Sequence, residues 1–375
     1  MSEAGGPSSG DAGQGAGETP SALPSKYPRV NARAVVASLV LVVACVWALS
    51  AGGLPLLPDA DSLARVTLVD HAVFIALMTT TQLTRFARWY FLLRPIAHVS
   101  FRKVMSIGAI GLAMVFFLPM RLGELARPVL LREKGRVSAL AVTGTVGAER
   151  IVDGVLFSAL LLGGLWIAKP HEPLPDHVGN LAVPTSLIPQ AARFAGAMFA
   201  TAFAVMATFY AFRSFARRVT EAVVGVVSKD LAKKVADAVE RLSDGFRFLV
   251  HGRYTAAYLA LTLLSMSMQI FAVQELGNAL GMDELTFTRT TVVLGVLALG
   301  FAVPNAPGFF GTAQLALYAG LAVYVAPEKV PREGSTLVFL YYSVNVVIIV
   351  VMAGIALMAE VRGKRNGSGN PEAAS

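Results

Sequence analysis

The sequence predicts an all-α polytopic membrane protein, and composition and patterning both support this fold class. Hydrophobic residues make up 55% of the 375 residues and charged residues only 15%, whereas soluble domains carry roughly 25% charged residues. Several apolar runs have close to the ~20 residues that a membrane-spanning helix needs. These runs are continuous and do not alternate between apolar and polar residues, which argues against a transmembrane β-barrel.

Composition also narrows the classes of function. The chain has one cysteine, Cys45, and five scattered histidines, so it contains no pattern of metal ligands and no internal disulfide. We therefore expect no metal and no cofactor. The net charge is +8, but the basic residues flank apolar runs, which fits orientation in a membrane better than binding of nucleic acid.

A single membrane domain is predicted between two tails. Residues 1–30 and 362–375 are rich in small and polar residues, which is typical of disordered segments. The domain over 31–361 contains apolar segments near 34–52, 68–90, 104–120, 144–168, 192–212, 254–275, 287–303, 309–325 and 335–359.

The distribution of basic residues predicts the topology of these segments. Lys26, Arg29 and Arg33 place the N-terminus in the cytoplasm. A full span at 104–120 would put the next basic loop outside and reverse every later loop. The conflict disappears if 104–131 is a re-entrant hairpin from the cytoplasm and 287–325 a second one from outside.

The predicted bundle thus has about six full spans plus two opposed re-entrant helical hairpins. Both termini are cytoplasmic, and the chain lies in the cell (inner) membrane. Broken segments that enter from opposite faces are a recurrent design of transporters, with the substrate site between them.

A cytoplasmic amphipathic helix is predicted within residues 213–253. Its apolar positions recur every three or four residues, and they are Val219, Val223, Val227, Leu231, Val235, Val239, Leu242, Phe246 and Leu249. It would lie on the membrane or pack on the bundle, and we favour a lipid-surface anchor over a site for a partner protein.

The first motif that carries chemistry lies in the first predicted hairpin, from Pro119 to Pro128. Arg121, Glu124 and Arg127 are spaced to share one helical face. A charge at the bilayer centre costs at least ~2.5 kcal/mol, so these side chains must pair or face a polar cavity. The alternative is a charge cluster that only caps the hairpin at the cytoplasmic interface.

A second charged cluster, Glu149, Arg150 and Asp153, opens a strongly apolar run. Its carboxylates can pair with Arg121 and Arg127 and leave one arginine free for a phosphate, whose oxygens fit the planar guanidinium fork. The alternative is that the two clusters only neutralise each other, and both interpretations can hold together.

The third motif is a helix break in the second predicted hairpin. Prolines interrupt the helix and glycines permit unusual backbone at Pro304, Asn305, Pro307, Gly308 and Gly311. The N-terminus of the next helix could receive an anion, and the alternative is an ordinary extramembrane loop.

Other polar residues within apolar segments are given structural roles. We expect Gln314 and Asn345 to make hydrogen bonds between helices. Arg85 and Arg88, next to Trp89 and Tyr90, are predicted to form an interfacial belt, which we favour over a contact with substrate.

The three motifs together resemble the lysylphosphatidylglycerol synthase transmembrane region, a flippase-like family of integral membrane proteins. The matching residues are Arg121, Gly123, Glu124, Arg127 and Pro128, then Glu149, Arg150 and Asp153, then Pro304, Pro307, Gly308 and Gly311. The resemblance covers about residues 34–360. It implies a membrane domain that moves a lipid between leaflets, and in the best-known relatives this domain is fused to a soluble aminoacyl-transferase.

We therefore predict a flippase-like protein that binds or translocates an anionic or modified lipid, either a phospholipid or a polyprenyl-phosphate-linked one. Arg121, Glu124, Arg127, Glu149, Arg150 and Asp153 are its candidate head-group residues. We expect no enzyme activity, because the sequence has no nucleotide-binding loop or nucleophile–base motif. Two alternatives stay open: a glycosyltransferase-type enzyme that modifies lipids, and a scaffold for such an enzyme.

Overall fold

A computed structural model describes residues 32–118, 123–134, 138–170, 177–178, 180–182, 185–225, 229–302 and 306–367, and these residues form a helical bundle. The helices are α1 (Ala32–Ala51), α2 (Ala60–Arg65), α3 (Leu68–Leu93), α4 (Phe101–Phe117), α5 (Ala126–Lys134), α6 (Ala139–Ile167), α7 (Ile188–Ala211), α8 (Arg213–Gly225), α9 (Lys229–Ser243), α10 (Gly252–Ala279), α11 (Phe287–Ala302), α12 (Thr312–Leu321) and α13 (Glu333–Gly367). A two-residue β-hairpin, β1 (His177–Val178) and β2 (Leu181–Ala182), is the only sheet among the described residues.

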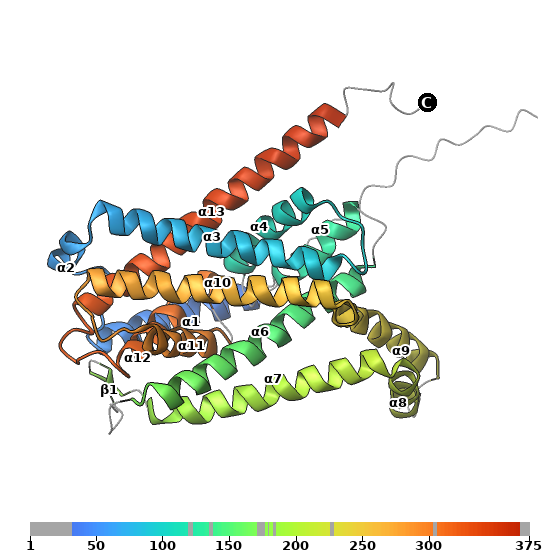
Figure 1. Cartoon of the computed structure of the whole chain (residues 1–375), viewed down its shortest axis with the longest axis horizontal. Coiled ribbons are helices and arrows are strands. Elements are labelled where there is room, and N and C mark those ends of the chain that lie inside the picture. Colours follow the sequence, from blue (N-terminus) through green and yellow to red (C-terminus); the bar gives the residue numbers. More distant parts are fainter. Residues whose placement is uncertain are drawn as a thin grey trace, which may run out of the picture.

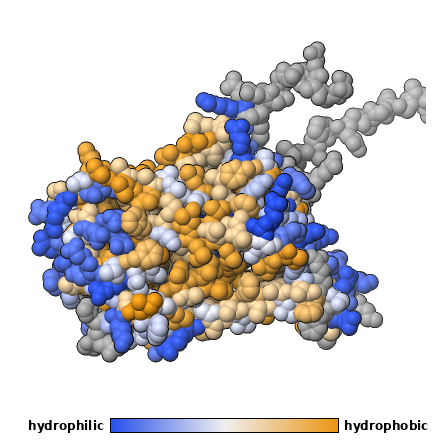
Figure 2. All heavy atoms as spheres, in the orientation of Figure 1, coloured by the Kyte–Doolittle hydropathy of each residue, from blue (hydrophilic) through white to orange (hydrophobic). Residues whose placement is uncertain are grey.

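The long helices run along the bundle axis. The surface in the middle of the bundle is apolar, and its two ends are polar. α3, α6, α7, α10 and α13 run along this axis, and α3 lies beside α10 (Figure 1). By length and composition, α6, α7, α10 and α13 can each cross a membrane. Apolar residues cover the middle of the face seen in Figure 2, and hydrophilic residues gather towards both ends. The predicted all-α membrane bundle is confirmed.

Two pairs of short helices lie at opposite ends of the bundle (Figure 1). α4 and α5 have 17 and 9 residues, and α11 and α12 have 16 and 10, so each is shorter than the ~20 residues of a full span. Each pair has the helix–break–helix form predicted for 104–131 and 287–325. Their re-entry into a membrane stays a prediction.

The breaks of the two pairs depend on glycine. Gly123 lies against the backbone of Met114 and Val115, where a Cβ would overlap main-chain atoms. Gly308 and Gly311 have φ angles of +72° and +84°, a region that favours glycine. Phe309, between them, contacts Phe116 at the end of α4, with 6.1 Å between ring centroids. The second break therefore meets the C-terminal end of α4.

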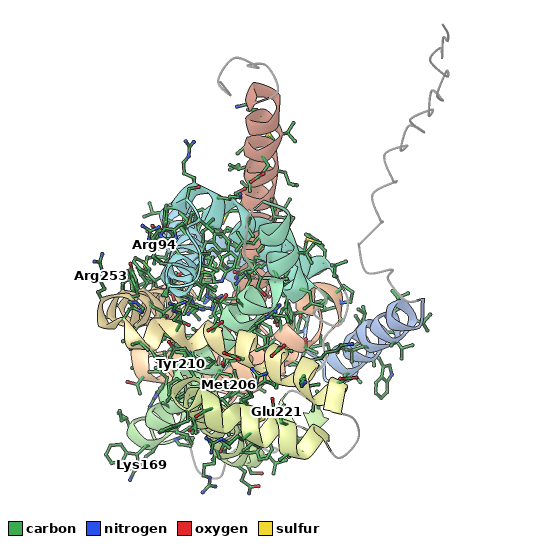
Figure 3. The ribbon with its side chains drawn as sticks, turned by 90° about the vertical axis from the view of Figure 1, so that its right-hand side faces the viewer. Arg94, Lys169, Met206, Tyr210, Glu221 and Arg253 are labelled. Atoms are coloured by element: carbon green, nitrogen blue, oxygen red, sulfur yellow. The ribbon has the colours of Figure 1, made fainter. Side chains whose placement is uncertain are left out.

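The predicted amphipathic helix over 219–250 is wrong as a continuous element. The chain instead forms α8, α9 and a 3-10 segment, η3 (Asp244–Val250), and α8 and α9 pack on each other across one end of the bundle (Figure 3). The apolar spacing in the sequence continues from α8 into α9, so periodicity alone did not reveal that these are two helices.

The inner face of this end segment packs on the bundle. Ala232, Ala236, Phe246 and Phe248 are buried, and α9 and η3 contact α6 and α7. Of the two predicted placements, packing on the bundle is therefore the one that the structure shows for α9 and η3.

Candidate functional site

A cavity of about 270 Å³ lies where the two broken helical pairs meet the long helices. Its lining contains both apolar residues, aromatic and aliphatic, and charged or polar residues. The apolar part includes Phe86, Leu112, Phe116, Phe157, Leu161, Phe199, Leu297, Phe301 and Phe309, and the polar part includes Gln82, Arg85, Arg88, Glu124, Arg127, Glu149, Arg150, Asp153, Gln269, Tyr341 and Asn345.

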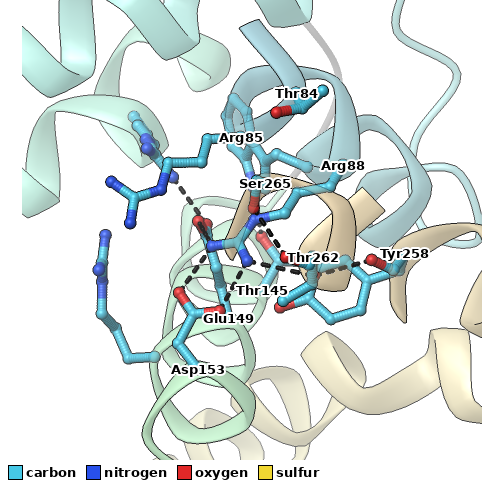
Figure 4. Close-up of polar contacts among 12 residues, drawn as sticks. Thr84, Arg85, Arg88, Thr145, Glu149, Asp153, Tyr258, Thr262 and Ser265 are labelled. Carbon is cyan, nitrogen blue, oxygen red and sulfur yellow. Dashed lines mark hydrogen bonds and ion pairs between the residues drawn. The ribbon is translucent and has the colours of Figure 1, made fainter. Parts of the chain in front are cut away.

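Arg88 of α3 holds the two acidic residues of α6 (Figure 4). Its guanidinium donates to both carboxylate oxygens of Asp153, at 2.7 and 2.6 Å, and to Oε1 of Glu149 at 2.9 Å. It also donates to Oγ1 of Thr262 on α10 at 3.1 Å. Arg88 is only 2% exposed, so this network replaces the water that these charges lose on burial.

Arg127 joins the first short pair to the same network. Its Nη1 donates to Oε2 of Glu149 at 2.8 Å, and its guanidinium lies 5.2 Å from the centroid of the Trp89 ring. The stem of Arg127 packs against Gly111 of α4, where an added Cβ would lie 2.6 Å from its Cγ. α5 is thereby tied to α4, α6 and α3.

Arg150 and Glu124 form a more exposed pair. Nε of Arg150 lies 3.6 Å from Oε1 of Glu124, and the side chains are 41% and 26% exposed. Of the predicted pairs, Arg127 with Glu149 is present, whereas Asp153 is bound by Arg88 and Arg121 lies outside the described residues. The pair of Arg150 with Glu124 was not predicted.

Arg85 lies one turn before Arg88 and has a different environment. Its Nη2 donates to Oε1 of Gln269 at 3.3 Å, and Gln269 donates to the hydroxyl of Tyr341 at 2.6 Å. Within the described part of the chain, Arg85 forms no ion pair with a carboxylate. Four arginines and three carboxylates line the cavity among the described residues, so the formal excess is one positive charge.

The chain matches a known protein family over nearly its whole length. Residues 34–359 match the family described as the lysylphosphatidylglycerol synthase TM region. The chain belongs to this family. No curated protein and no solved structure matches it.

In this member of the lysylphosphatidylglycerol synthase TM family, the first two motifs come together at the cavity. Glu124, Arg127, Glu149, Arg150 and Asp153 all line it. The candidate Arg121 lies outside the described residues. Whether these residues bind a head group stays a prediction.

The residues of the predicted hairpin breaks are placed in part. Pro128 is buried in the first turn of α5, where its missing N–H is tolerated. Pro307 begins the short 3-10 turn η4 (Pro307–Phe309) between α11 and α12. Gly308 lines the cavity, while Pro304 and Asn305 lie outside the described residues.

The predictions of interhelical hydrogen bonds for Gln314 and Asn345 have different outcomes. Asn345 of α13 accepts a hydrogen bond from Gln82 of α3 at 3.3 Å, so the predicted bond between helices is confirmed. Gln314 instead accepts from the backbone N–H of Gly311 at 2.7 Å and caps its own helix. The backbone N–H of Gly311, at the helix N-terminus where an anion was predicted to bind, is therefore already bonded to Gln314.

The predicted interfacial belt at the end of α3 is wrong for Arg88 and Trp89, which are 2% and 1% exposed. Arg88 is the main functional candidate that the sequence reasoning missed. A signal was present, because Gln82, Arg85 and Arg88 recur every three residues in the mostly apolar C-terminal half of α3. Such a polar face predicts burial against partners more directly than contact with a membrane surface.

Proposed function

We propose that this protein binds an anionic or modified membrane lipid by its head group and moves it between leaflets. The observation that carries the proposal is the cavity at the two helix breaks, whose wall combines charged side chains with aromatic rings. A lipid likewise combines a charged head with an apolar chain. Membership of the family agrees with a membrane role for this cavity.

The size of the cavity supports a head-group site. Its volume of about 270 Å³ is at the lower limit of ligand pockets, which range over about 300–1,000 Å³. A head group with its phosphate can be enclosed there, while the acyl or isoprenoid chains stay in the bilayer. Phe157 and Phe199 would then contact the first carbons of those chains.

The arrangement of the short pairs supports translocation. α4 and α5 enter from the end that carries α8 and α9, and α11 and α12 enter from the other end (Figure 1). In transporters, opposed broken helices enclose a site that opens alternately to each side. A shift of one pair relative to the other would open the cavity to one leaflet and close it to the other.

The proposal also predicts how the protein is oriented in the membrane and what partner it has. The loops and helices at the α8–α9 end are rich in arginine and lysine, so this end would face the cytoplasm at the inner membrane. The protein would itself catalyse no reaction. A separate lipid-modifying enzyme would supply the lipid.

A leaflet assay tests this function. Liposomes with and without the purified protein receive fluorescent phospholipid or polyprenyl-phosphate probes, and dithionite then quenches the outer leaflet. We expect faster loss of the protected signal with the wild type. We expect Arg127→Ala to abolish this increase in the rate of lipid movement, because it removes one of the two arginines that pair with Glu149.

The matched control is Arg253→Gln, which changes an exposed arginine whose guanidinium stacks on Tyr254, far from the charged network. It should translocate like the wild type. Size-exclusion profiles and thermal unfolding in detergent separate loss of function from loss of fold. If no probe moves faster than in empty liposomes, the proposed function is wrong.

A further inference from the structure

We propose that Arg85 and Gln82, one turn apart on α3, form a subsite for a phosphodiester that carries a single negative charge beside a hydroxyl group. The same cavity would reject head groups that carry an ammonium. This inference rests on the proposed function and specifies its substrate class. It follows from four features of the cavity wall.

The first feature is that Arg85 is the one lining arginine, among the described residues, that forms no ion pair with a carboxylate. Arg88, Arg127 and Arg150 each have a carboxylate partner within 3.6 Å. Arg85 is held only by the neutral amide of Gln269, and its other N–H groups have no hydrogen-bond partner among the described residues. Because a charge at this depth is costly without a counter-ion, an anion at Arg85 would stabilise the site.

The second feature is an unsatisfied acceptor on the same helical face. Gln82 is 4% exposed, and its Oε1 has no hydrogen-bond partner in the part of the chain that is described. The orientation of this amide is fixed through Asn345, whose Nδ2 donates to the backbone oxygen of Tyr341 at 2.7 Å. Oδ1 of Asn345 must therefore accept from Nε2 of Gln82, which leaves Oε1 as the unpaired acceptor of a residue that lines the cavity.

The third feature is that the carboxylates are already engaged. Both oxygens of Asp153 accept from Arg88, and the two oxygens of Glu149 accept from Arg88 and Arg127. Glu124 is paired with Arg150. Every carboxylate among the described lining residues is already paired with an arginine, so a lysyl or choline ammonium would add a cation without a carboxylate of its own. A neutral hydroxyl is the donor that fits Gln82 without adding charge.

The fourth feature is the charge balance. The excess of one arginine over the carboxylates among the described lining residues matches one phosphodiester charge. A diphosphate would bring further negative charge beside Glu149 and Asp153, and like charges at close range are unfavourable in a low-dielectric site. A zwitterion would add a cation that nothing in this wall compensates.

Two lipid classes share the selected chemistry. One is a glycerophospholipid whose head group carries hydroxyls, such as phosphatidylglycerol. The other is a hexose joined to a polyprenol through one phosphate. Both present a monoanionic phosphodiester next to hydroxyl groups, and separate arms of one experiment distinguish them.

The experiment compares translocation of labelled lipids in liposomes that contain the full chain. The probes are phosphatidylglycerol, hexosyl-phospho-polyprenol, phosphatidylmethanol, phosphatidylcholine, lysyl-phosphatidylglycerol and polyprenyl diphosphate. We expect one of the first two to move at least about tenfold faster than the last three, which corresponds to about 1.4 kcal/mol. Phosphatidylmethanol, an anion without a head-group hydroxyl, should lie between.

Variants at these two positions assign the selectivity to residues. Arg85→Gln should slow the preferred lipid at least about tenfold, and Arg85→Lys should restore part of the rate. Gln82→Leu should bring the preferred lipid down to the rate of phosphatidylmethanol while keeping the preference for anions. Gln82→Glu alone adds a carboxylate that can pair with Arg85, so it should slow the anions. Arg85→Gln/Gln82→Glu leaves that carboxylate without this partner, so it should speed lysyl-phosphatidylglycerol, a gain that misfolding cannot produce.

The outcomes separate this inference from the proposed function. Equal movement of lysyl-phosphatidylglycerol and the anionic lipids, or a wild-type rate in Arg85→Gln, would overturn the subsite and leave translocation standing. Movement of no probe at all would overturn both. Arg253→Gln again serves as the control and should keep the wild-type order of lipids.

Discussion

The α4–α5 pair is tied to the bundle by ion pairs, whereas the α11–α12 pair is held by close backbone packing and neutral hydrogen bonds. In the first, Arg127 reaches Glu149, and Glu149 is in turn bound by Arg88. In the second, an added Cβ at Gly295 of α11 would lie 2.8 Å from Cβ of Leu161 on α6, and one at Gly311 would overlap Cys45 on α1.

Polar contacts follow the same division. Tyr318 of α12 donates to the backbone oxygen of Pro55 at 2.6 Å, and Gln314 caps α12 through Gly311. A charged ligand in the cavity would therefore compete with the contacts of the first pair and leave those of the second intact. The comparison predicts that charge changes disrupt the first pair and that added volume disrupts the second.

The largest effect is expected from Arg88→Met, which preserves length but removes the cation between Glu149 and Asp153. Breaking a buried ion pair by removing one partner costs about 3–5 kcal/mol. We expect this loss in the free energy of unfolding, measured by denaturation in detergent. Arg94→Met, at the C-cap of α3, removes an arginine whose guanidinium stacks on Tyr90 and should change stability by less than about 1 kcal/mol.

Equal stability of Arg88→Met and wild type would show that the network does not hold the α4–α5 pair. A second measurement locates the damage. Cysteine labelling at Leu125, which is 50% exposed, should become faster in Leu125→Cys/Arg88→Met than in Leu125→Cys alone. The background for both is Cys45→Ala, because Cys45 is the only native cysteine.

The sequence predicted both helix pairs because charge distribution constrains topology. A full span at 104–120 would have placed Arg132 and Lys134 outside, and hydrocarbon thickness leaves few other solutions. The pairing of Arg127 with Glu149 was also predictable, since an isolated charge at that depth is too costly. These inferences use only sign, spacing and length.

The role of Arg88 could not be inferred in the same way. Next to Trp89 and Tyr90, an arginine at the end of a span has the composition of an interfacial belt. Its burial depends on Thr262 of α10 and Asp153 of α6, which lie 174 and 65 residues away in the chain. Three-dimensional packing, and not the local sequence pattern, determines which arginines pair with carboxylates and which do not.

A smaller effect, on the second pair, is expected from Gly311→Ala. The φ of Gly311 is +84°, and a Cβ there would overlap the side chain of Cys45 on α1. Strain and overpacking of this kind cost about 1–3 kcal/mol. Thermal unfolding in detergent should show the loss, and Gly311→Ala/Cys45→Gly should recover part of it.

Gly354→Ala is the matched control, because a Cβ on this glycine of α13 meets no atom within 4 Å. Alanine has the higher helix propensity, so stability should stay equal or rise by up to about 1 kcal/mol. If Gly311→Ala and Gly354→Ala behave alike, close packing does not hold the α11–α12 pair.

The smallest effect is expected at the outer end of the second pair, where charge does contribute. Lys329 donates to Oε1 of Glu284 at 2.9 Å, and both side chains are about a third exposed, at 33% and 29%. Burial opposes ionisation of Glu284, but the hydrogen bond from Lys329 leaves the pKa of its carboxyl below the ordinary 4.5. The same hydrogen bond raises the pKa of Lys329 above 10.5.

The sign of the pH dependence follows from these two shifts. Because the folded pKa of Glu284 is lowered, its contribution is present above pH 4.5 and is lost as the pH falls through the folded value. The contribution of Lys329 is present below pH 10.5 and is lost as the pH rises through its raised value. Lys329→Met should therefore reduce the free energy of unfolding at neutral pH by at most about 1 kcal/mol. It should also make the fall in stability less steep at both acid and alkaline pH. The exposed Glu328→Gln should leave this pH dependence unchanged. An equally steep fall at acid pH in Lys329→Met would show that other carboxylates cause it.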